Sequence, residues 1–320
     1  MDELAIIDKI FRPLATPGAP AFGLRNDTAI YTPPEGYDLV LTKDVMIEGV
    51  HFLETEDAKV VARRLLRSNL SDLAASAATP VGYLLGLMGT AKIKTAWWQA
   101  FGASLAFEQK EFGIALFGGD TTSGSKSLCL SITALGIVQR GGELTRLGAS
   151  PGDLVCVSGT IGDATLGLSS LKGEIGHDDF LIARFQNPLP RLDLGRALLG
   201  LASATIDISD GLVMDLESLC AASEVGATLD LDAVPLSPPA KDYANAGPDN
   251  LIHLVTGGDD FELLFTVPPQ HRDELPALAK KTGLPITVIG EINDTRRVDV
   301  RGKDGRLVAI KTKGYRHFKE

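Results

Sequence analysis

Apolar and polar residues follow two periods along the chain, and each period predicts one kind of element. Stretches in which every second residue is apolar predict strands, and apolar residues spaced three and four apart predict helices. In the first half of the chain these patterns predict helices at residues 2–12, 57–78 and 95–112, and strands at residues 38–46, 83–89, 114–119 and 128–138.

The second half of the chain repeats this mixture. Strands are predicted at residues 154–159, 204–209, 227–232, 261–267 and 285–292, and helices at 163–171, 178–186, 191–201, 211–223, in the 240s and at 271–283, before a β-rich tail. Helices and strands alternate in both halves, which predicts an α/β fold, or α+β packing, with mixed sheets.

A cluster of Gly and Pro at residues 141–153 separates two apolar stretches and predicts a boundary between domains. A chain of 320 residues is long for one domain. We therefore expect two domains, at residues 1–145 and 146–320.

Composition narrows the class of protein. Hydrophobic residues make up 44% and charged residues 22%, and no apolar run approaches the roughly 20 residues that cross a bilayer. The N-terminal segment MDELAIIDKIF carries acids where a secretory signal has basic residues, so we expect a cytoplasmic protein without a membrane partner. Cys129, Cys156 and Cys220 have neither metal-site nor disulfide spacing and are expected as buried thiols.

The net charge of −10 bears on the partner. Nucleic-acid surfaces neutralise phosphates with Lys and Arg, so this balance argues against a nucleic-acid partner. It suits a protein that handles small anions through divalent cations, although it could equally serve solubility.

Glycine followed by an acid recurs in the chain, first in FGGDTTSG at residues 117–124. The glycines would let backbone N–H groups approach a phosphate, but the segment lacks the GK[ST] ending of a P-loop. An acid beside a phosphate needs a cation between them, so Asp120 is predicted as a Mg²⁺ ligand. A simple Gly-Asp turn is the alternative.

Further carboxylates stand at positions that favour metal binding. Asp72 shares a face with Asn69 beside an apolar helical stripe, where a carboxylate is costly unless it is paired, metal-bound or solvated. Other acids of this kind are Asp27, Asp207 with Asp210, and Asp259 with Asp260. Glu262 is predicted as a polar contact at a strand edge, or as a solvated strand residue.

The segment DISDG ends an apolar strand and opens a helix. Ser209 would be an ordinary N-cap, which would account for Asp210 but not for Asp207. Many carboxylates and no distinctive nucleophile favour phosphoryl transfer by positioning and Mg²⁺ electrostatics, with no residue in a covalent catalytic role.

Taken in order, eight motifs strongly resemble those of thiamine-monophosphate kinases: RNDTA, TKDVMIEGVHF, NLSDLAA, FGGDTTSG, LTRLGASPGD, DISDGL, GGDDFELLF and KGYRHF. These enzymes belong to the superfamily of aminoimidazole ribonucleotide synthetase and selenophosphate synthetase. The resemblance implies ATP-dependent phosphorylation of thiamine phosphate to thiamine diphosphate. It also implies an N-terminal domain that binds ATP and Mg²⁺ and pairs its sheet across a homodimer interface, and a C-terminal α/β domain.

The resemblance also implies roles for individual residues. The implied Mg²⁺ ligands are Asp27, Thr42, Lys43, Asp44, Asp72, Asp120, Asp207 and Asp210. The implied ATP contacts are Gly119, Asp120, Arg146 and Ser209, and the implied thiamine phosphate contacts are His51, Glu262, Phe318 and Tyr315. Direct in-line attack by the thiamine phosphate oxygen, without a phosphoenzyme, is expected because that oxygen is already deprotonated near neutral pH.

Two positions depart from the family pattern. Asn26 stands where the family usually has an acid, and Lys43 stands where it usually has Thr. Strand alternation sends the Lys43 side chain away from Thr42 and Asp44, so only its backbone carbonyl would bind Mg²⁺. The side chain could instead reach an acid or an ATP phosphate.

Rival functions differ in their sequence requirements. Selenophosphate synthetase needs a reactive Cys near its N-terminus and the hydrogenase-maturation relative a C-terminal Cys, whereas the first cysteine here is Cys129 and the chain ends in KE. An aminoimidazole ribonucleotide synthetase-like enzyme remains an alternative, as does a noncatalytic nucleotide- or metal-binding regulator that lost activity through Asn26 and Lys43.

Overall fold

The computed structural model describes residues 2–90, 93–124, 126–315 and 317, which form two compact units. Unit 1 contains the described residues up to Leu73 together with Ala78–Gly141, and unit 2 contains Ala74–Ala77 and the described residues from Gly142 onward. In the described chain no helix is both long and apolar enough to cross a bilayer. The predicted mixture of helices and strands with mixed sheets is confirmed.

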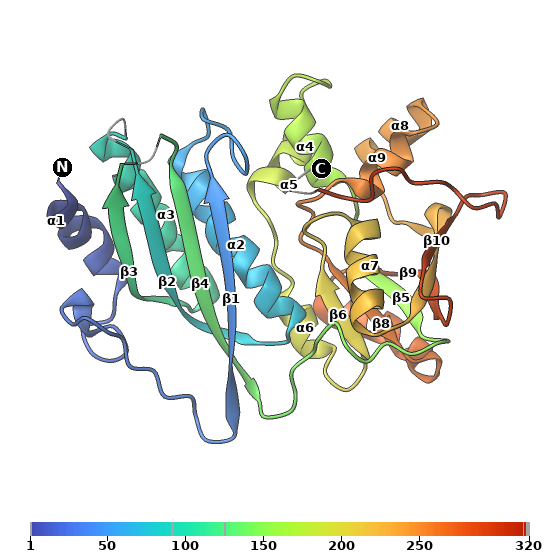
Figure 1. Cartoon of the computed structure of the whole chain (residues 1–320), viewed down its shortest axis with the longest axis horizontal. Coiled ribbons are helices and arrows are strands. Elements are labelled where there is room, and N and C mark those ends of the chain that lie inside the picture. The colour runs from blue at the N-terminus through green and yellow to red at the C-terminus, as the bar shows by residue number, and fades with distance from the viewer. Residues whose placement is uncertain (1, 91–92, 125, 316, 318–320) are drawn as a thin grey trace. The chain divides into compact units, whose positions relative to one another are not determined.

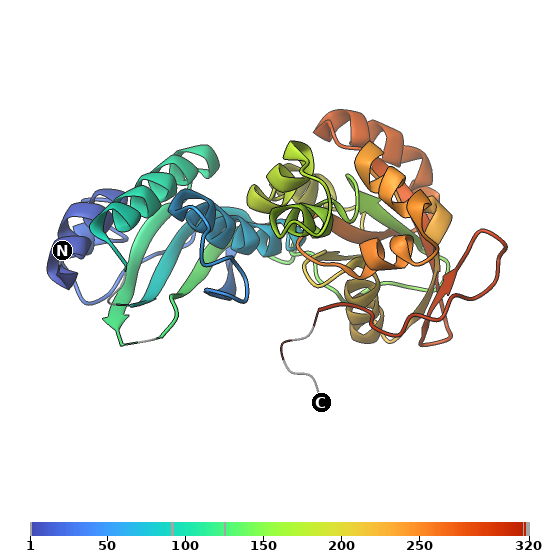
Figure 2. The ribbon, with the colours of Figure 1, turned by 90° about the horizontal axis from the view of Figure 1, so that it is seen from above.

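The centre of unit 1 is a sheet whose described strands follow the order β1-β4-β2-β3 (Figure 1). These strands are β1 (Tyr37–Ile47), β2 (Thr79–Gly89), β3 (Ala115–Ser123) and β4 (Cys129–Gln139). β4 runs antiparallel to β1 and β2, and β2 runs parallel to β3. Helices α2 (Ala58–Ala75) and α3 (Thr95–Phe112) cover one face of this sheet (Figure 2).

The N-terminal helix is less regular than predicted. It is built from α1 (Glu3–Ile6), a π-helical turn at Ile7–Phe11 and a 3₁₀ turn at Arg12–Leu14. Pro13, in the 3₁₀ turn, has no backbone N–H, so the helical hydrogen bonds cannot continue through it. A further 3₁₀ turn follows at Phe22–Leu24.

Strand β1 presents different faces to its two sides. Thr42, Asp44 and Met46 are partly or fully buried, whereas the residues between them are exposed. Leu41 is 61% exposed and Val45 42%. The predicted alternation is confirmed, and within the described residues an apolar face of the sheet stays in contact with solvent.

Unit 2 contains a second sheet, with described strands in the order β10-β7-β9-β5-β8-β6. Its strands are β5 (Leu154–Ser158), β6 (Ala204–Asp207), β7 (Gly226–Asp230), β8 (Leu263–Val267), β9 (Ile286–Asn293) and β10 (Val298–Arg301). Apolar residues of the sheet pack against Leu212, Leu216 and Leu219 of α7 (Leu212–Ala222), which forms the core on that face.

Further helices of unit 2 surround this core. They are α4 (Asp163–Leu171), α5 (Asp179–Gln186), α6 (Leu192–Ala197), α8 (Pro238–Ala246), α9 (Asn250–Thr256) and α10 (Leu275–Thr282), with 3₁₀ turns at Leu231–Ala233 and Pro269–Glu274. Helix α10 packs against α6 and β9. Strand β8 starts two residues later than predicted, because Asp259 and Phe261 have φ angles of 70° and 51°, which a strand cannot contain.

The segment Ala74–Ala77, at the end of α2, belongs to unit 2. The hydroxyl of Thr205 donates a hydrogen bond to the carbonyl oxygen of Ala75, and the N–H of Leu144 donates to that of Ser76 at 3.4 Å. Gly195 lies so close to Ala74 that a Cβ there would be 2.0 Å from the carbonyl oxygen. Unit 2 is therefore assembled from two separate stretches of the chain.

Candidate functional site

In unit 1, predicted metal ligands meet where β1 faces α2. The hydroxyl of Thr42 donates a hydrogen bond to the carboxylate of Asp72. The N–H of Asp44 donates to Oδ1 of Asn69 at 3.2 Å, and Nδ2 of Asn69 donates to the carbonyl oxygen of Leu65 at 2.9 Å. The prediction that Asn69 and Asp72 share one face of the helix is confirmed. This face forms hydrogen bonds with Thr42 and Asp44 on the polar side of β1.

The segment after β1 folds back on itself around His51. Its Nδ1 accepts a hydrogen bond from the N–H of Ile47 at 3.0 Å, which leaves Nε2 on the far side of the ring. The carboxylate of Glu48 accepts from the N–H of Leu128 at 3.1 Å. Arg64, which is 1% exposed, donates to the carbonyl oxygen of His51 at 3.4 Å. These hydrogen bonds fix the conformation of the loop, and the backbone N–H of Ile47 orients the imidazole of His51.

Asn26 and Asp27 lie in an exposed loop. Nδ2 of Asn26 donates to the carbonyl oxygen of Thr28 at 2.9 Å and to its hydroxyl at 3.2 Å. The side chain that replaces an acid thus stabilises a local turn. Asp27 remains exposed beside it.

Gly119 and Asp120 lie inside strand β3, which continues past the predicted end at residue 119 to Ser123, so the alternative of a Gly-Asp turn was wrong. Gly119 faces Leu85 of β2 so closely that a Cβ would lie 2.0 Å from the Leu85 carbonyl oxygen. The glycine is therefore required by strand pairing. Asp120 is exposed at the neighbouring position of the strand.

In unit 2, the predicted ligands Asp207 and Asp210 flank a loop that Asp215 holds in place. One oxygen of Asp215 accepts hydrogen bonds from the N–H groups of Ser209, Asp210 and Gly211, each at 3.1 Å. Burial, and after it the neighbouring Asp210, raise the pKa of Asp215 to about 7, although the three N–H groups oppose the rise. The predicted N-cap role of Ser209 was wrong, because Gly211 occupies the N-cap of α7 without a side-chain cap.

Several charged and aromatic groups meet around Asp210. Burial is the main cause that raises its pKa; Asp259 adds to the rise, whereas His317 and Arg146 oppose it. The N–H of Tyr315 donates to the Asp210 carbonyl oxygen at 3.0 Å. The predicted residues Arg146, Asp210 and Tyr315 are thus brought together, while Phe318 lies outside the described residues.

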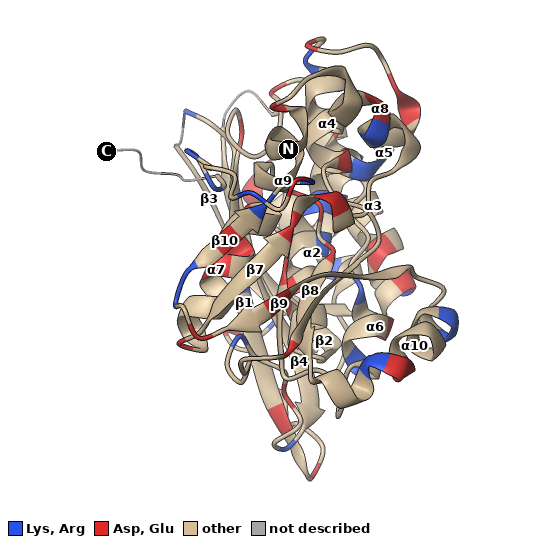
Figure 3. Cartoon of the chain, turned by 90° about the vertical axis from the view of Figure 1, so that its right-hand side faces the viewer, with Lys and Arg blue, Asp and Glu red and all other residues tan. Residues whose placement is uncertain are grey.

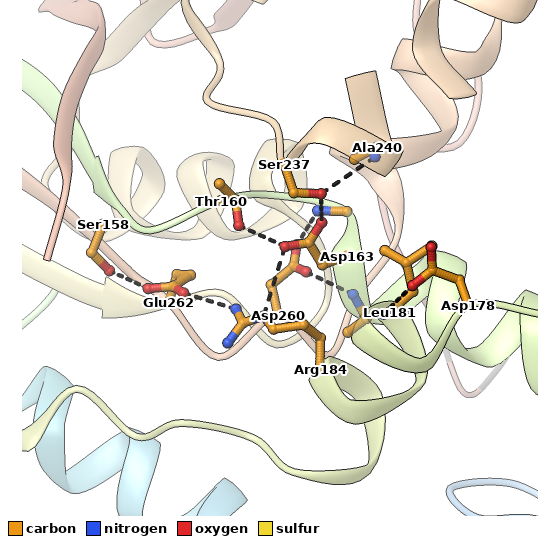
Figure 4. A network of polar contacts seen from close by, with 12 residues as sticks. Ser158, Thr160, Asp163, Asp178, Leu181, Arg184, Ser237, Ala240, Asp260 and Glu262 are labelled. Carbon is orange, nitrogen blue, oxygen red and sulfur yellow. Dashed lines mark hydrogen bonds and ion pairs between the residues drawn. The ribbon is translucent and has the colours of Figure 1, made fainter. Parts of the chain in front are cut away.

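Glu262 is fully buried in a polar cluster, so the alternative of a solvated strand residue was wrong. Oε2 accepts from Ser158 Oγ at 2.6 Å and from Arg191 Nε at 2.7 Å. Oε1 accepts from Arg184 Nη2 at 2.8 Å and from Arg191 Nη2. A Cβ on Gly159 would lie 2.2 Å from Oε1, so glycine is needed beneath this carboxylate. Figure 4 shows Ser158 and Arg184 on opposite sides of Glu262.

The same cluster continues to two further buried acids (Figure 4). Asp163 accepts from the hydroxyl of Thr160 at 2.6 Å and from that of Ser237. Asp260 accepts from the N–H of Gly162 at 2.7 Å and from that of Ala164 at 3.3 Å. Burial raises the pKa of Asp260 to about 8 even though these N–H groups and Arg184 lower it.

The oxygen atoms of the β1–α2 site in unit 1 and of the Asp207–Asp210 loop in unit 2 are ligands of the kind that Mg²⁺ binds. This ion takes oxygen ligands and usually keeps several waters, with one or two protein carboxylates and the substrate phosphates. Within the described residues no group of three or more His, Cys, Asp or Glu side chains forms a ready-made metal centre. A site of the Mg²⁺-phosphate kind needs no such cage, and a cation would relieve the repulsion between Asp210 and Asp259.

Sequence reasoning did not single out Asp215, Ser158, Arg184 or Arg191. Asp215 stands four residues after Gly211 in the first turn of a predicted helix, where an acid interacts with free N–H groups, so a signal was present. The arginines are 78 and 71 residues from Glu262 in sequence, and no local pattern joins them. All three cysteines are free thiols, with Cys156 and Cys220 buried as predicted and Cys129 only partly buried.

Acidic and basic residues are interspersed on the helices of unit 2. Figure 3 shows both signs along α5 and α8, whereas α10 carries lysines and the turn before it carries both signs.

Two family models match the chain one after the other. The model for "AIR synthase related protein, N-terminal domain" matches residues 25–138, and the model for "AIR synthase related protein, C-terminal domain" matches residues 150–303. Together the two matches span most of the chain.

Individual relatives match over nearly the full length. Thiamine-monophosphate kinase of Caulobacter vibrioides is 40% identical over 319 residues, covering 98% of this chain and 90% of that protein. The crystal structure of thiamine-monophosphate kinase from Stenotrophomonas maltophilia K279a is 37% identical, with a TM-score of 0.84, and the match covers 96% of this chain and 98% of that one.

A third match is a structure of AaThiL complexed with AMPPCP and TMP. It is 30% identical, with a TM-score of 0.79, and the match covers 99% of this chain and 97% of that one. The likeness predicted from the ordered motifs is therefore confirmed over the whole chain.

The raised pKa of Asp260 predicts a pH-dependent stability. The folded protein keeps a proton on Asp260 up to about pH 8, whereas an unfolded aspartate releases it near pH 4. The contribution of this group is therefore fully present below about pH 4 and is lost as the pH rises through 8. The side chain in Asp260→Asn cannot ionise, so the variant does not lose this stability as the pH rises. Its free energy of unfolding minus that of the wild type should therefore increase by about 1 kcal/mol or more between pH 5 and pH 9.

Urea unfolding of both proteins at several pH values measures this difference. Asp230→Asn changes an exposed aspartate of β7 and serves as the control for the loss of a carboxylate at the surface. A difference that stays constant for Asp260→Asn, or that shrinks as the pH rises, would contradict the assignment.

Proposed function

We propose that this chain, which belongs to the thiamine-monophosphate kinase family, uses ATP to phosphorylate thiamine phosphate and forms thiamine diphosphate. The observation that carries the proposal is the full-length match to a relative that was solved with both AMPPCP and TMP. The polar side of β1 and the loop held by Asp215 support it, because both offer oxygen ligands of the kind that Mg²⁺-dependent phosphoryl transfer requires.

We expect a direct in-line transfer. The acceptor oxygen belongs to a phosphate that is already deprotonated near neutral pH, so the protein needs to orient it rather than remove a proton from it. Bound Mg²⁺ would supply neutralisation of the phosphate charge. The chain's own part is to hold its carboxylates in place, as Asp215 does for the loop of Asp207 and Asp210.

The residue roles stay as predicted. We propose Asp27, Thr42, Asp44, Asp72 and Asp120 in unit 1, with the backbone of Lys43, and Asp207 and Asp210 in unit 2, as Mg²⁺ ligands. Arg146 and Ser209 of unit 2 and Gly119 with Asp120 of unit 1 are proposed to contact ATP, and His51, Glu262, Tyr315 and Phe318 to form the thiamine phosphate site. A cytoplasmic location and the roles assigned to residues 1–145 and 146–320 also stay predictions.

The assay that tests this function is direct. The purified chain incubated with ATP, Mg²⁺ and thiamine phosphate should release thiamine diphosphate and ADP in equal amounts, because one phosphoryl group is transferred in each turnover. Chelation of Mg²⁺ with EDTA should abolish the product. Absence of thiamine diphosphate, alongside turnover of a purine precursor, would show that the chain is a different synthetase of the superfamily.

We also propose that the exposed apolar face of β1 mediates homodimerisation. Leu39, Leu41, Val45 and Ile47 lie on this face, and Leu84 and Met88 of β2 add to it. Leaving so many large apolar side chains in water is unfavourable, so burial against a second copy would stabilise the protein.

Leu41→Glu should convert the dimer to a monomer, because a carboxylate at the centre of this face would have to be buried. Light scattering after size-exclusion chromatography measures the mass. Leu4→Glu changes a more exposed leucine of α1 and should leave the dimer intact. A wild-type chain that elutes as a monomer, or an unaltered Leu41→Glu dimer, would contradict the proposal.

Lys43 is exposed on the side of β1 opposite Thr42 and Asp44. We propose that its ammonium group reaches a neighbouring acid or an ATP phosphate and so takes over part of one cation's role. Lys43→Thr should then increase the Mg²⁺ concentration needed for half-maximal activity by roughly threefold or more, since one positive charge is lost. Titration of activity with Mg²⁺ measures the change, and Lys303→Thr in an exposed turn is the control. An unchanged Mg²⁺ requirement would rule out this role.

A further inference from the structure

Strand β3 contains one extra residue, Phe117, shortly before Asp120. The two neighbours of Phe117 in the chain pair with consecutive residues of β2, Tyr83 and Leu84, so Phe117 itself has no partner in the register. Such a β-bulge changes the direction in which the side chains after it point. Residues three apart in a regular strand point to opposite faces of a sheet, whereas the bulge brings Phe117 and Asp120 to the same face.

Two glycines of β2 show that Phe117 and Asp120 share this face. A Cβ on Gly82 would lie 2.2 Å from the Phe117 ring, so the ring lies directly on this glycine. Asp120 is paired with Gly86, and residues 82 and 86 are an even number apart in β2, so both point to one face. Leu84 lies between them on the same face and is 40% exposed, which makes this the solvent-facing side of the sheet.

The Asp27 loop, which runs from Ala15 to Tyr31, is attached to β3 at two adjacent positions. At its beginning, Ala15 forms a parallel bridge with Leu116. At its end, the ring of Tyr31 stacks on the ring of Phe117, with centroids 5.7 Å apart and an angle of 28° between the ring planes. Both ends of the loop are therefore fixed immediately before the part of β3 that carries the predicted ligand.

Between these attachments the tip of the Asp27 loop is exposed over residues 25–30. The N–H of Ile30 donates to the carbonyl oxygen of Pro20 at 3.1 Å, which joins the outgoing and the returning arm. Tyr31 follows Ile30 directly, so its ring holds the returning arm to the sheet. Because stacked rings attract each other beyond the area that they bury, this contact is a specific attachment.

We propose that Tyr31 and Phe117 are positioning residues for the Mg²⁺-ATP site. Their stacked rings hold the Asp27 loop on the face of β3 that presents Asp120, and they act through Asp27 without contacting the nucleotide. The inference rests on the proposed function, in which both carboxylates bind Mg²⁺. A carboxylate that is already held in place binds the ion without the cost of ordering its loop.

The attachment is tested without any ligand by limited proteolysis. Arg25 is exposed at the tip of the loop, so the rate of tryptic cleavage after it reports how firmly the loop is held. Tyr31→Ala should increase this rate by about threefold or more, because the stacking is lost. Tyr31→Phe keeps the ring and should be cleaved like the wild type.

A second cleavage site separates local release from unfolding. Cleavage after Lys59, which is exposed on α2 of the same unit, should be equally slow in all variants. If Tyr31→Ala accelerates this cleavage as well, Tyr31→Leu, which keeps an apolar side chain without an aromatic ring, takes its place.

The effect on the site is measured by calorimetric titration with AMPPCP in excess Mg²⁺. Asp27→Asn and Tyr31→Ala should each raise the Kd by about threefold or more, because the first removes a charged ligand and the second leaves its loop only partly in the binding conformation. The double variant should bind no more weakly than Asp27→Asn alone, since Tyr31 acts through Asp27. Tyr31→Phe should restore the wild-type Kd. Phe107→Ala removes a 59% exposed ring from α3 and should leave the Kd unchanged.

The outcomes are distinct. Effects of Tyr31→Ala and Asp27→Asn that multiply in the double variant would show that Tyr31 acts on the nucleotide by another route, which overturns the inference. Unchanged cleavage after Arg25 in Tyr31→Ala, or an unchanged Kd in either single variant, overturns it as well. A wild-type chain that binds AMPPCP with Mg²⁺ but forms no thiamine diphosphate overturns the proposed function alone, whereas a chain that does not bind AMPPCP overturns both.

Discussion

The cost of removing a carboxylate from water is the constraint on which the polar architecture of this chain depends. An acid buried without donors destabilises a fold by more than most single contacts contribute. The chain meets this constraint in two ways. Backbone N–H groups donate to Asp215 and Asp260, and arginines donate to Glu262 in unit 2 and, as Arg63 and Arg67, to the fully buried Glu108 in unit 1. The donors to Asp215 are local, four to six residues away, whereas those to Asp260, Glu262 and Glu108 come from elements that are distant in sequence, so these three acids act as fixed points of the fold.

The acids consequently fall into two groups with different chemistry. One oxygen of Asp215 and both oxygens of Glu262 are occupied by protein donors, which suits these residues to hold a loop or another side chain in position. Asp27 and Asp120 are exposed, and Asp210 is half-buried beside a second carboxylate. Oxygens of this second group can accept a hard cation without breaking the fold. Some acidic residues thus hold the structure in place, and other acidic residues near them remain able to bind a ligand.

Local periodicity was sufficient to predict most elements and the two faces of β1. The side of α2 that carries Asn69 and Asp72 was also predictable, because helical spacing is a property of a short stretch. The need for glycine at position 119 was not predictable, since its reason is the close approach of Leu85 from another strand. The arginines around Glu262 were not predictable either, because the tertiary fold brings them to the carboxylate. Charge alone does not identify which of the 31 basic residues pairs with it.

The inclusion of Ala74–Ala77 in unit 2 limits how this protein can be divided or recombined. A fragment that starts at Gly142 would lack the carbonyl oxygens that accept hydrogen bonds from Thr205 and Leu144, and the surface against which Gly195 packs. No single cut in the chain yields both units whole. Exchange of the C-terminal half between relatives would therefore have to carry the end of α2 with it, and the two halves are expected to change together over evolutionary time.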